Sequence, residues 1–152
     1  KTDLLLFFAA RSENFEKIIK KNYRKKIILI DRFTDSTVAY QHFGMKIDLK
    51  IIKTLNKFII GKFKPNITFL SVVNLKNLKS RLNKRLKLDR YDKFKFNFYK
   101  KIQNGYIKIS KKNKNKYVMI DSNEPILDNK NRIIKEVNKL LKWLIVQKHK
   151  LN

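Results

Sequence analysis

The stretch IILIDRFTDSTVAYQ, residues 27–41, gives the clearest indication of the fold. Ile27 to Ile30 form a short continuous apolar run, which predicts a strand buried on both faces. The run ends in Asp31-Arg32, and ligands of open α/β sheets bind outside the carboxyl ends of the strands. An acid there can hold a metal-bound water, and an arginine can bind a phosphate with two parallel hydrogen bonds. From these residues alone, a simple ion pair at a strand end stays open as the alternative.

The rest of the chain alternates between helical and strand patterns. Helices are expected at Thr2–Lys20, from Asp48 to about Ile60, from Asn74, around Phe94, Phe98 and Ile102, and from about Asp128 to Lys148. Further strands are expected at Ile67–Val73 and Tyr117–Asp121, with loops at Lys84–Asp92 and Lys111–Lys116. Strands that alternate with helices predict a parallel α/β sheet. We see no internal repeat and no second domain.

Composition excludes several classes of protein. The 152 residues are 43% hydrophobic, enough for a hydrophobic core, so a wholly disordered basic tail is excluded. No stretch approaches the roughly 18 consecutive apolar residues of a membrane span. The chain has no cysteine, which excludes disulfides, thiolate metal sites and a cysteine nucleophile. We expect a cytoplasmic protein.

The net charge of +26 can be interpreted in two ways. Such a charge is typical of nucleic-acid binding, because each neutralised phosphate adds affinity. However, only seven of the 38 basic residues are arginine, the side chain preferred for bidentate phosphate and base contacts. The many lysines are accompanied throughout by Ile, Asn and Phe, which indicates drift of the composition toward AT-rich codons. Composition alone leaves both interpretations open.

Four motifs, in order along the chain, resemble those of the thymidylate kinase family. Asp31–Gln41 is similar to its Asp-Arg-aromatic, Ser-x-x-Ala-Tyr-Gln segment, and Leu4–Arg11 to its apolar-Leu-Phe-aromatic-Ala-Ala-Arg helix. Lys64–Leu70 resembles its Pro-Asp-Leu-Thr strand entry, and Leu88–Asp92 its Leu-Asp-Arg-apolar-Glu lid signature, within a lid at residues 84–92. The resemblance covers essentially the whole chain. It implies a P-loop kinase-type fold, a three-layer α/β/α parallel sheet.

The resemblance also implies which side chains bind the acceptor, thymidine monophosphate (dTMP). Phe7 would stack on the thymine ring, and Arg11, one helical turn further on, would donate to a thymine carbonyl. Thr37 and Gln41 would face the base edge from a short helix. Tyr40 would lie against the sugar and disfavour a 2′-hydroxyl. Core packing is the alternative for Phe7 and Tyr40, and a solvated helix position is the alternative for Arg11.

The implied reaction is transfer of the γ-phosphoryl group of ATP to dTMP, giving dTDP, with Mg²⁺. Arg32 would hold the acceptor phosphate, and Asp31 would help to position it and contact Mg²⁺ through water. In the lid, Arg85 and Arg90 would close over the donor phosphates. Ile120-Asp121 resembles the end of the strand near the family's adenine pocket, which implies that Asp121 contributes to ATP binding. The resemblance further implies a homodimer, with neither nucleic acid nor membrane as a partner.

The sequence departs from the family in one major respect. No G-x-x-x-x-G-K-[ST] phosphate-binding loop occurs in the 152 residues, and the three glycines, Gly44, Gly61 and Gly105, are isolated. The family carries this loop on its first strand. We therefore expect the chain to be the C-terminal two-thirds to three-quarters of a single kinase domain, lacking the N-terminal strands and inactive by itself. The alternatives are a pseudoenzyme that binds nucleotide without turnover and a basic nucleic-acid-binding module.

Smaller departures affect the expected phosphate and lid geometry. Ser71 and Val72 stand where an acidic residue often ends the strand. Leu86 replaces a glycine expected before the lid signature, and Phe33 stands where tyrosine or histidine is common.

Overall fold

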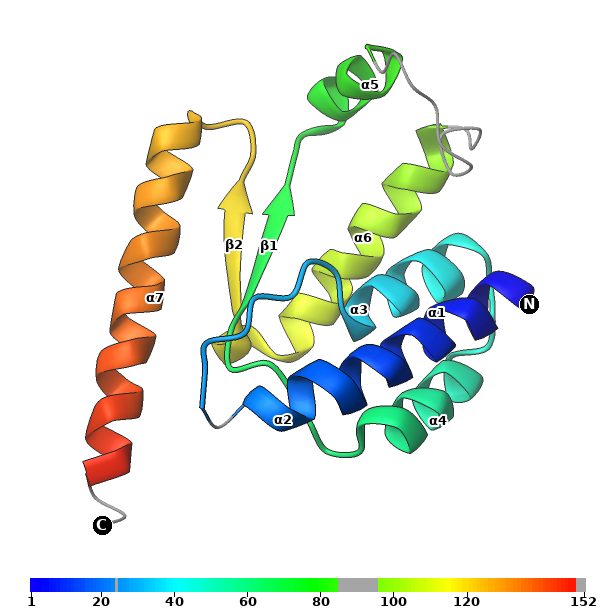
Figure 1. Cartoon of the computed structure of the whole chain (residues 1–152). Coiled ribbons are helices and arrows are strands. Elements are labelled where there is room, and N and C mark those ends of the chain that lie inside the picture. The colour runs from blue at the N-terminus through cyan, green and yellow to red at the C-terminus, as the bar shows by residue number, and fades with distance from the viewer. Residues whose placement is uncertain (24, 85–95, 150–152) are drawn as a thin grey trace. The chain divides into compact units, whose positions relative to one another are not determined.

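The computed structural model describes residues 1–23, 25–84 and 96–149 (Figure 1). These residues fall into two units, which are described separately. The helical unit comprises Lys1–Asn66 and Lys87–Lys116, and the sheet unit comprises Ile67–Leu86 and Tyr117–Asn152. Most of the expected lid, including Arg85 and Arg90, lies outside the described residues.

The first helical stretch of the helical unit agrees with the prediction for residues 2–20. It consists of α1 (Thr2–Asn14), a π-helical segment η1 (Phe15–Ile19) and α2 (Lys20–Asn22). Leu4 and Phe8 of α1 are 6% and 3% exposed and pack with Ile52 of α4 (Leu49–Ile60). These three side chains form a hydrophobic core in which α1 lies against α4.

The helix predicted from Asp48 is confirmed, and its ends have local causes. The Asp48 carboxylate accepts from the backbone N–H of Lys50 at 2.7 Å, which satisfies one of the free donors at the helix start. The helix ends at Gly61, whose φ of 57° lies in the left-handed region that glycine adopts readily. Ile52 is completely buried, as the apolar spacing of this helix predicts.

The segment after Asp31 is helical and packs closely against a later helix of the same unit. It consists of α3 (Thr34–Thr37) and a π-helical segment η2 (Val38–Gly44), and η2 packs on α6 (Phe96–Lys112). A Cβ atom added to Gly105 of α6 would lie 2.6 Å from the Phe43 ring. Glycine therefore permits the close approach of η2 and α6. Helix α6 extends into the predicted loop at 111–116, and the 3-10 turn η3 (Lys114–Lys116) completes that segment.

The sheet unit confirms the parallel α/β class. Strands β1 (Thr68–Val72) and β2 (Tyr117–Asp121) pair in parallel, with Thr68 opposite Tyr117 and Val72 opposite Asp121. Helix α5 (Leu75–Asn83) follows β1, and α7 (Ile126–His149) follows β2 (Figure 1). Both strands lie within the predicted ranges. In the described part of the chain, no helix is long and apolar enough to span a membrane.

The strand predicted at Ile27–Ile30 is wrong. This segment has no regular secondary structure, and Ile27, Leu29 and Ile30 are 69%, 90% and 38% exposed. A buried parallel strand needs neighbouring strands that satisfy its backbone groups and cover its side chains. Among the described residues the only sheet is the β1–β2 pair, to which this segment does not belong. The apolar run therefore leads into the Asp31-Arg32 turn as extended chain.

Candidate functional site

The Asp31-Arg32 turn joins the extended segment to α3 in the helical unit. Both side chains are exposed. Arg32 has a φ of 60°, a left-handed conformation that costs a residue with a Cβ about 1 kcal/mol. Strained backbone of this kind is concentrated at functional sites. The turn is thus a candidate site on conformational grounds, independent of its sequence motif.

Arg11 connects three parts of the helical unit. Its Nη2 donates to the Thr37 hydroxyl at 2.7 Å and to the Phe33 carbonyl oxygen at 3.3 Å. Its Nη1 donates to Asn56 Oδ1 on α4 at 3.4 Å. Arg11 is therefore not a freely solvated helix residue, because α1, the start of α3 and α4 all contact its guanidinium group. The contact with Thr37 brings the Leu4–Arg11 and Asp31–Gln41 motifs together.

Two aromatic rings flank the Arg11 guanidinium group. Its Cζ lies 5.1 Å from the centre of the Phe8 ring and 5.7 Å from that of the Phe33 ring. Burial lowers the pKa of Arg11, while the nearby Asp35 raises it. Since the ordinary pKa of arginine lies far above neutrality, Arg11 stays a cation at neutral pH. The site thus contains a fixed positive charge with several N–H donors.

Arg32 contacts Tyr40, one of the other predicted residues. Its Cζ lies 5.1 Å from the centre of the Tyr40 ring, which also packs edge-to-face on Phe98 at 6.3 Å between ring centres. Burial acts to lower the pKa of Arg32, but interactions with Tyr40 and Tyr106 raise it overall. Arg32 is therefore held as a cation beside the phenol ring, with its side chain still accessible to solvent.

Ser36 and Tyr106 form a further contact in the helical unit, and no role in the site was predicted for either residue. Their hydroxyl oxygens lie 2.6 Å apart and connect α3 to α6. Burial raises the pKa of Tyr106, and the hydrogen bond with Ser36 partly offsets this rise. The phenol therefore remains protonated at neutral pH. The two residues lie 70 positions apart, so no local pattern in the sequence indicates their contact.

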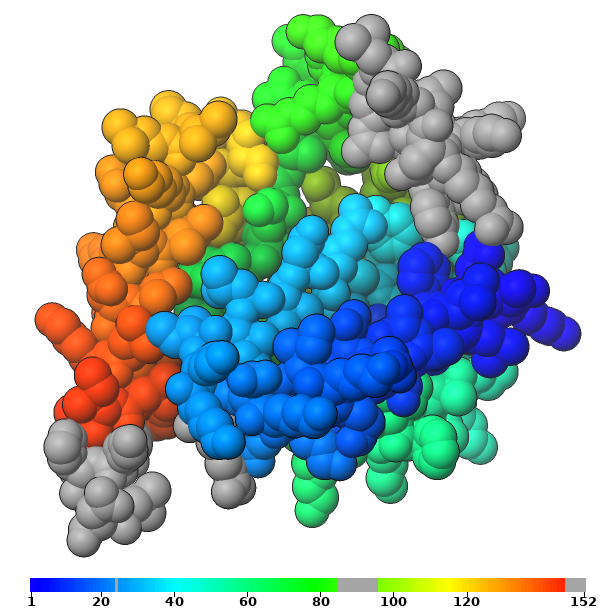
Figure 2. All heavy atoms as spheres, viewed as in Figure 1, coloured from blue at the N-terminus to red at the C-terminus, as the bar shows by residue number. Residues whose placement is uncertain are grey.

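The other residues predicted to bind the base are divided between buried and exposed positions. Thr37 and Gln41 are 3% and 2% exposed, whereas Phe7 is 42% exposed on α1. Phe8, the next residue of α1, belongs to the core. Figure 2 shows α1, in dark blue, at the surface of the molecule. The exposure of Phe7 leaves its ring available to a ligand.

An aromatic cluster next to the site was not predicted. The Phe63 ring packs edge-to-face with Phe15, Tyr23 and Phe33, with ring centres 5.4, 5.8 and 6.2 Å apart. Because Phe33 also lies against Arg11, the cluster includes one of the two rings that flank the guanidinium group. No local pattern could indicate this cluster, since Phe63 lies far along the sequence from the other three rings.

In the sheet unit, the ends of the two strands are connected by polar contacts. Asp121 accepts from the backbone N–H of Asn123 at 2.9 Å and from its side-chain amide. Asn123 Oδ1 accepts from the backbone N–H of Asn74 at 3.2 Å and from Asn77 Nδ2 at 2.9 Å. Arg81 donates to the Ser122 carbonyl oxygen at 2.7 Å. Asp121 thus organises the turn after β2, and Arg81 fixes α5 to that turn.

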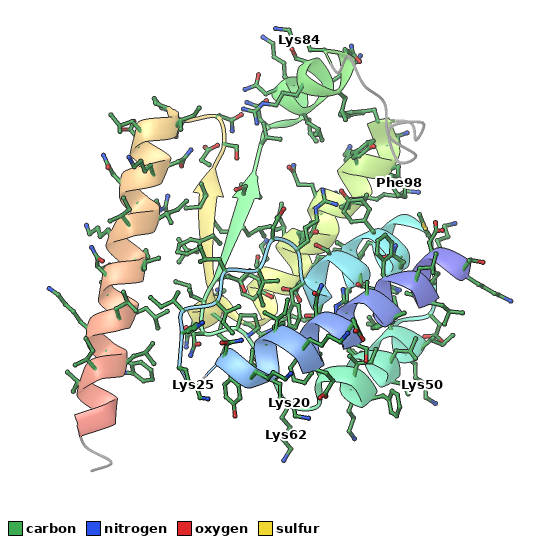
Figure 3. The ribbon with its side chains drawn as sticks, in the orientation of Figure 1. Lys20, Lys25, Lys50, Lys62, Lys84 and Phe98 are labelled. Atoms are coloured by element: carbon green, nitrogen blue, oxygen red, sulfur yellow. The ribbon has the colours of Figure 1, made fainter. Side chains whose placement is uncertain are left out.

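Four lysines of the helical unit point away from it. Figure 3 shows the side chains of Lys20, Lys25, Lys50 and Lys62 directed outward from this unit. All four are exposed. No group of three or more His, Cys, Asp or Glu side chains able to hold a metal occurs among the residues described.

Comparisons with known proteins agree with the motifs. The family model of thymidylate kinases matches residues 1–133. The thymidylate kinase of Kosmotoga olearia is 32% identical over 144 residues, covering 94% of this chain and 69% of the relative. That of Ehrlichia chaffeensis is 38% identical over 146 residues, covering 94% of this chain and 70% of the relative.

A solved structure is similar as well. The crystal structure of thymidylate kinase from Ehrlichia chaffeensis superposes with a TM-score of 0.66 at 34% sequence identity. The match covers 92% of this chain and 65% of that one. The chain thus spans about two thirds of the length of the proteins that it resembles.

Proposed function

Since the chain belongs to the thymidylate kinase family, we propose that it takes part in the transfer of the γ-phosphoryl group of ATP to dTMP, which gives dTDP and ADP. The observation that carries this proposal is the 2.7 Å hydrogen bond between Arg11 and Thr37. It joins the two motifs to which the family resemblance assigns base recognition. Both motifs lie in the helical unit, so acceptor binding is proposed there.

The thymine base is assigned to the side of the unit that carries Phe7 and Arg11. An exposed phenylalanine ring offers a large flat surface with few rotatable bonds, which suits stacking. A guanidinium group only donates hydrogen bonds, which suits a carbonyl of thymine. Thr37 and Gln41 supply a hydroxyl and an amide for the remaining base edge, and Tyr40 is proposed to face the sugar.

The acceptor phosphate is assigned to Arg32. Its cationic side chain is exposed at a strained turn and lies beside Tyr40. Arginine forms strong, charge-assisted hydrogen bonds with phosphate oxygens. The net charge of +26 adds a field that attracts anionic nucleotides toward the protein.

The proposal also includes contacts with Mg²⁺ and with the donor ATP. A single exposed carboxylate, Asp31, fits a Mg²⁺ ion held mainly by nucleotide phosphates and water. Bound Mg²⁺ would neutralise charge on the phosphate oxygens. We propose Arg85 and Arg90 for the donor phosphates and Asp121 for the adenine side, from the family resemblance. Residues 1–152 contain no G-x-x-x-x-G-K-[ST] motif, so this chain offers no such loop for the donor phosphates.

Two wider properties also follow from the resemblance. We propose a homodimer formed by helix packing, because Leu5, Leu6 and Ile18 of the first helical stretch are more than half exposed. We also propose that the protein acts in the cytoplasm, where nucleotide synthesis takes place and cysteine is not needed for disulfides.

Calorimetric titration with dTMP tests the proposed acceptor site. Phe7→Ala and Arg11→Ala are each expected to weaken dTMP binding by about tenfold or more, since each removes a main contact with the base. Phe58→Ala is the matched control, because Phe58 is an 87% exposed aromatic residue on α4 of the same unit. If both site variants bind dTMP as tightly as the unmodified protein, the proposed site is wrong.

Because residues 1–152 lack the phosphate-binding loop and are expected to be inactive by themselves, the next test uses a longer protein that carries a G-x-x-x-x-G-K-[ST] loop. A coupled assay for ADP on that protein distinguishes a kinase from a nucleotide-binding protein without turnover. ADP that forms from ATP only when dTMP is present supports phosphoryl transfer. Binding of dTMP without ADP formation supports the pseudoenzyme alternative. Absence of dTMP binding leaves the basic nucleic-acid-binding module as the remaining hypothesis.

A further inference from the structure

Asn56 of α4 is an unassigned residue in contact with the proposed base site. Its side-chain oxygen accepts from Arg11 Nη1 at 3.4 Å, whereas the other two acceptors, Thr37 and the Phe33 carbonyl, both bind Nη2. The guanidinium group is planar, so acceptors on its two terminal nitrogens together fix its rotation. Asn56 therefore provides the second contact that determines the orientation of the Arg11 guanidinium group.

The position of Asn56 in α4 suits this role. Asn56 lies one helical turn after Ile52, which is completely buried, so its amide projects beside the core contact between α1 and α4. Asparagine is a poor helix former, because its side chain competes for backbone hydrogen bonds. An asparagine inside a helix, one turn from a fully buried residue and in contact with a partly buried cation, indicates a role for its side chain.

We infer that Asn56 is a positioning residue: it orients Arg11 and thereby helps the site to distinguish thymine from cytosine. This inference rests on the proposed function, in which Arg11 donates to a carbonyl of the base. Thymine has a carbonyl oxygen at C4, whereas cytosine has an amino group there. A guanidinium group held in one orientation cannot satisfy that amino group, because both groups are donors.

Fixed orientation is what makes the discrimination strong. A site built to hydrogen-bond one group of a ligand strongly rejects an analogue that leaves a polar group unpaired. If Arg11 could rotate freely about its last bonds, it could turn away from the amino group of cytosine. Loss of Asn56 should therefore weaken dTMP binding more than it weakens binding of dCMP.

The test compares the dissociation constants of dTMP and dCMP by calorimetry for the unmodified protein, Asn56→Ala and Asn56→Asp. Asn56→Ala is expected to lower the preference for dTMP over dCMP by about 5- to 10-fold, the effect of losing one orienting hydrogen bond. Asn56→Asp keeps an acceptor of the same size at the same place and should retain the preference within about threefold. Thr54→Ala, at an exposed position of α4, is the matched control.

Each outcome either supports the inference or overturns it. Loss of the preference in Asn56→Ala together with its retention in Asn56→Asp supports it. An unchanged preference in Asn56→Ala overturns it, and so does an equal weakening of both nucleotides, which indicates a merely structural role. Loss in both variants overturns it as well, because the acceptor would not be the cause. If the unmodified protein does not bind dTMP, the proposed function fails first.

Discussion

The Arg11 guanidinium group donates to the Thr37 hydroxyl at 2.7 Å, across 26 positions of sequence. Thr37 is 3% exposed, so this hydrogen bond is shielded from water on the Thr37 side. Hydrogen bonds to charged groups contribute about 1.5–3 kcal/mol when they are partly buried. The same contact that defines the candidate site is therefore expected to stabilise the helical unit.

Thr37→Val tests this expectation, because valine has nearly the shape of threonine but offers no acceptor. The free energy of unfolding, measured by urea denaturation, should fall by about 1–3 kcal/mol. Combined with Arg11→Met in a double-mutant cycle, the change should show a coupling energy of about 1–2 kcal/mol. Thr54→Val at an exposed position of α4 serves as the control. A coupling energy near zero would show that the contact contributes nothing to stability.

Tyr106 predicts a specific pH dependence. Burial raises its pKa above the ordinary 10.0, so the unfolded chain loses this proton at lower pH than the folded protein does. The contribution of the neutral phenol is therefore complete below about pH 10 and declines as the pH rises through the pKa of the folded state.

The measurement compares Tyr106→Phe with the unmodified protein by urea denaturation at pH 8 and at pH 11. At pH 8 the variant should be less stable by about 1 kcal/mol, because it lacks the hydrogen bond with Ser36. At pH 11 the difference should shrink, and effects of the lysines largely cancel because both proteins share them. Ser36→Ala keeps the buried phenol and should retain the pH dependence. A difference that grows with pH would contradict the burial argument.

Gly105 predicts the effect of a very small change in packing. Alanine inside a helix is normally about 1 kcal/mol more favourable than glycine. At this position, however, the added Cβ would lie 2.6 Å from the Phe43 ring and 2.9 Å from the Phe43 Cβ. Gly105→Ala is therefore expected to destabilise the protein by about 1–3 kcal/mol, through displacement of η2 from α6.

Thermal unfolding of two further variants makes this prediction specific. Asn104→Ala, at the exposed neighbouring position, should leave the melting temperature unchanged or raise it slightly. Phe43→Leu should recover part of the loss when it is combined with Gly105→Ala, because the smaller side chain leaves room. If Gly105→Ala alone raises the melting temperature, the close approach of η2 and α6 is not a constraint on stability.

Those helices and strands whose formation depends on local interactions could be predicted from the sequence. The helix after Asp48 follows from a capping carboxylate and regular apolar spacing, and the strand at Tyr117–Asp121 from a short apolar run of suitable length. The run at Ile27–Ile30 has the same local character, yet it forms no strand. Strand formation depends on a neighbouring strand, and the apolar run itself does not indicate whether such a neighbour is present.

For the same reason, only part of the candidate site could be predicted from the sequence. The motifs identified Arg11 and Thr37, but not Asn56, whose contact with Arg11 joins residues 45 positions apart. Likewise, the hydrogen bond of Ser36 depends on how α6 packs against α3. Contacts between distant segments follow from tertiary packing, which periodicity and spacing do not describe.

Arg32 gives the most direct test of where the phosphate binds. Arg32→Ala should weaken binding of dTMP by about 10- to 100-fold, because it removes charge-assisted hydrogen bonds to the phosphate. Thymidine, which has no phosphate, should bind the variant and the unmodified protein equally well. Calorimetry with both ligands therefore measures the phosphate contribution as the ratio of their affinities.

The control for this test must remove the same charge elsewhere. Arg132→Ala on α7 of the sheet unit does so at an exposed position, and the net charge falls equally in both variants. If the field of the whole protein governed binding, the two variants would lose dTMP affinity to the same extent, and both losses would diminish with added salt. A loss confined to Arg32→Ala, with thymidine unaffected, would instead place the phosphate at the strained turn. Equal weakening of thymidine and dTMP in Arg32→Ala would contradict this assignment, because the turn would then be supporting the site as a whole.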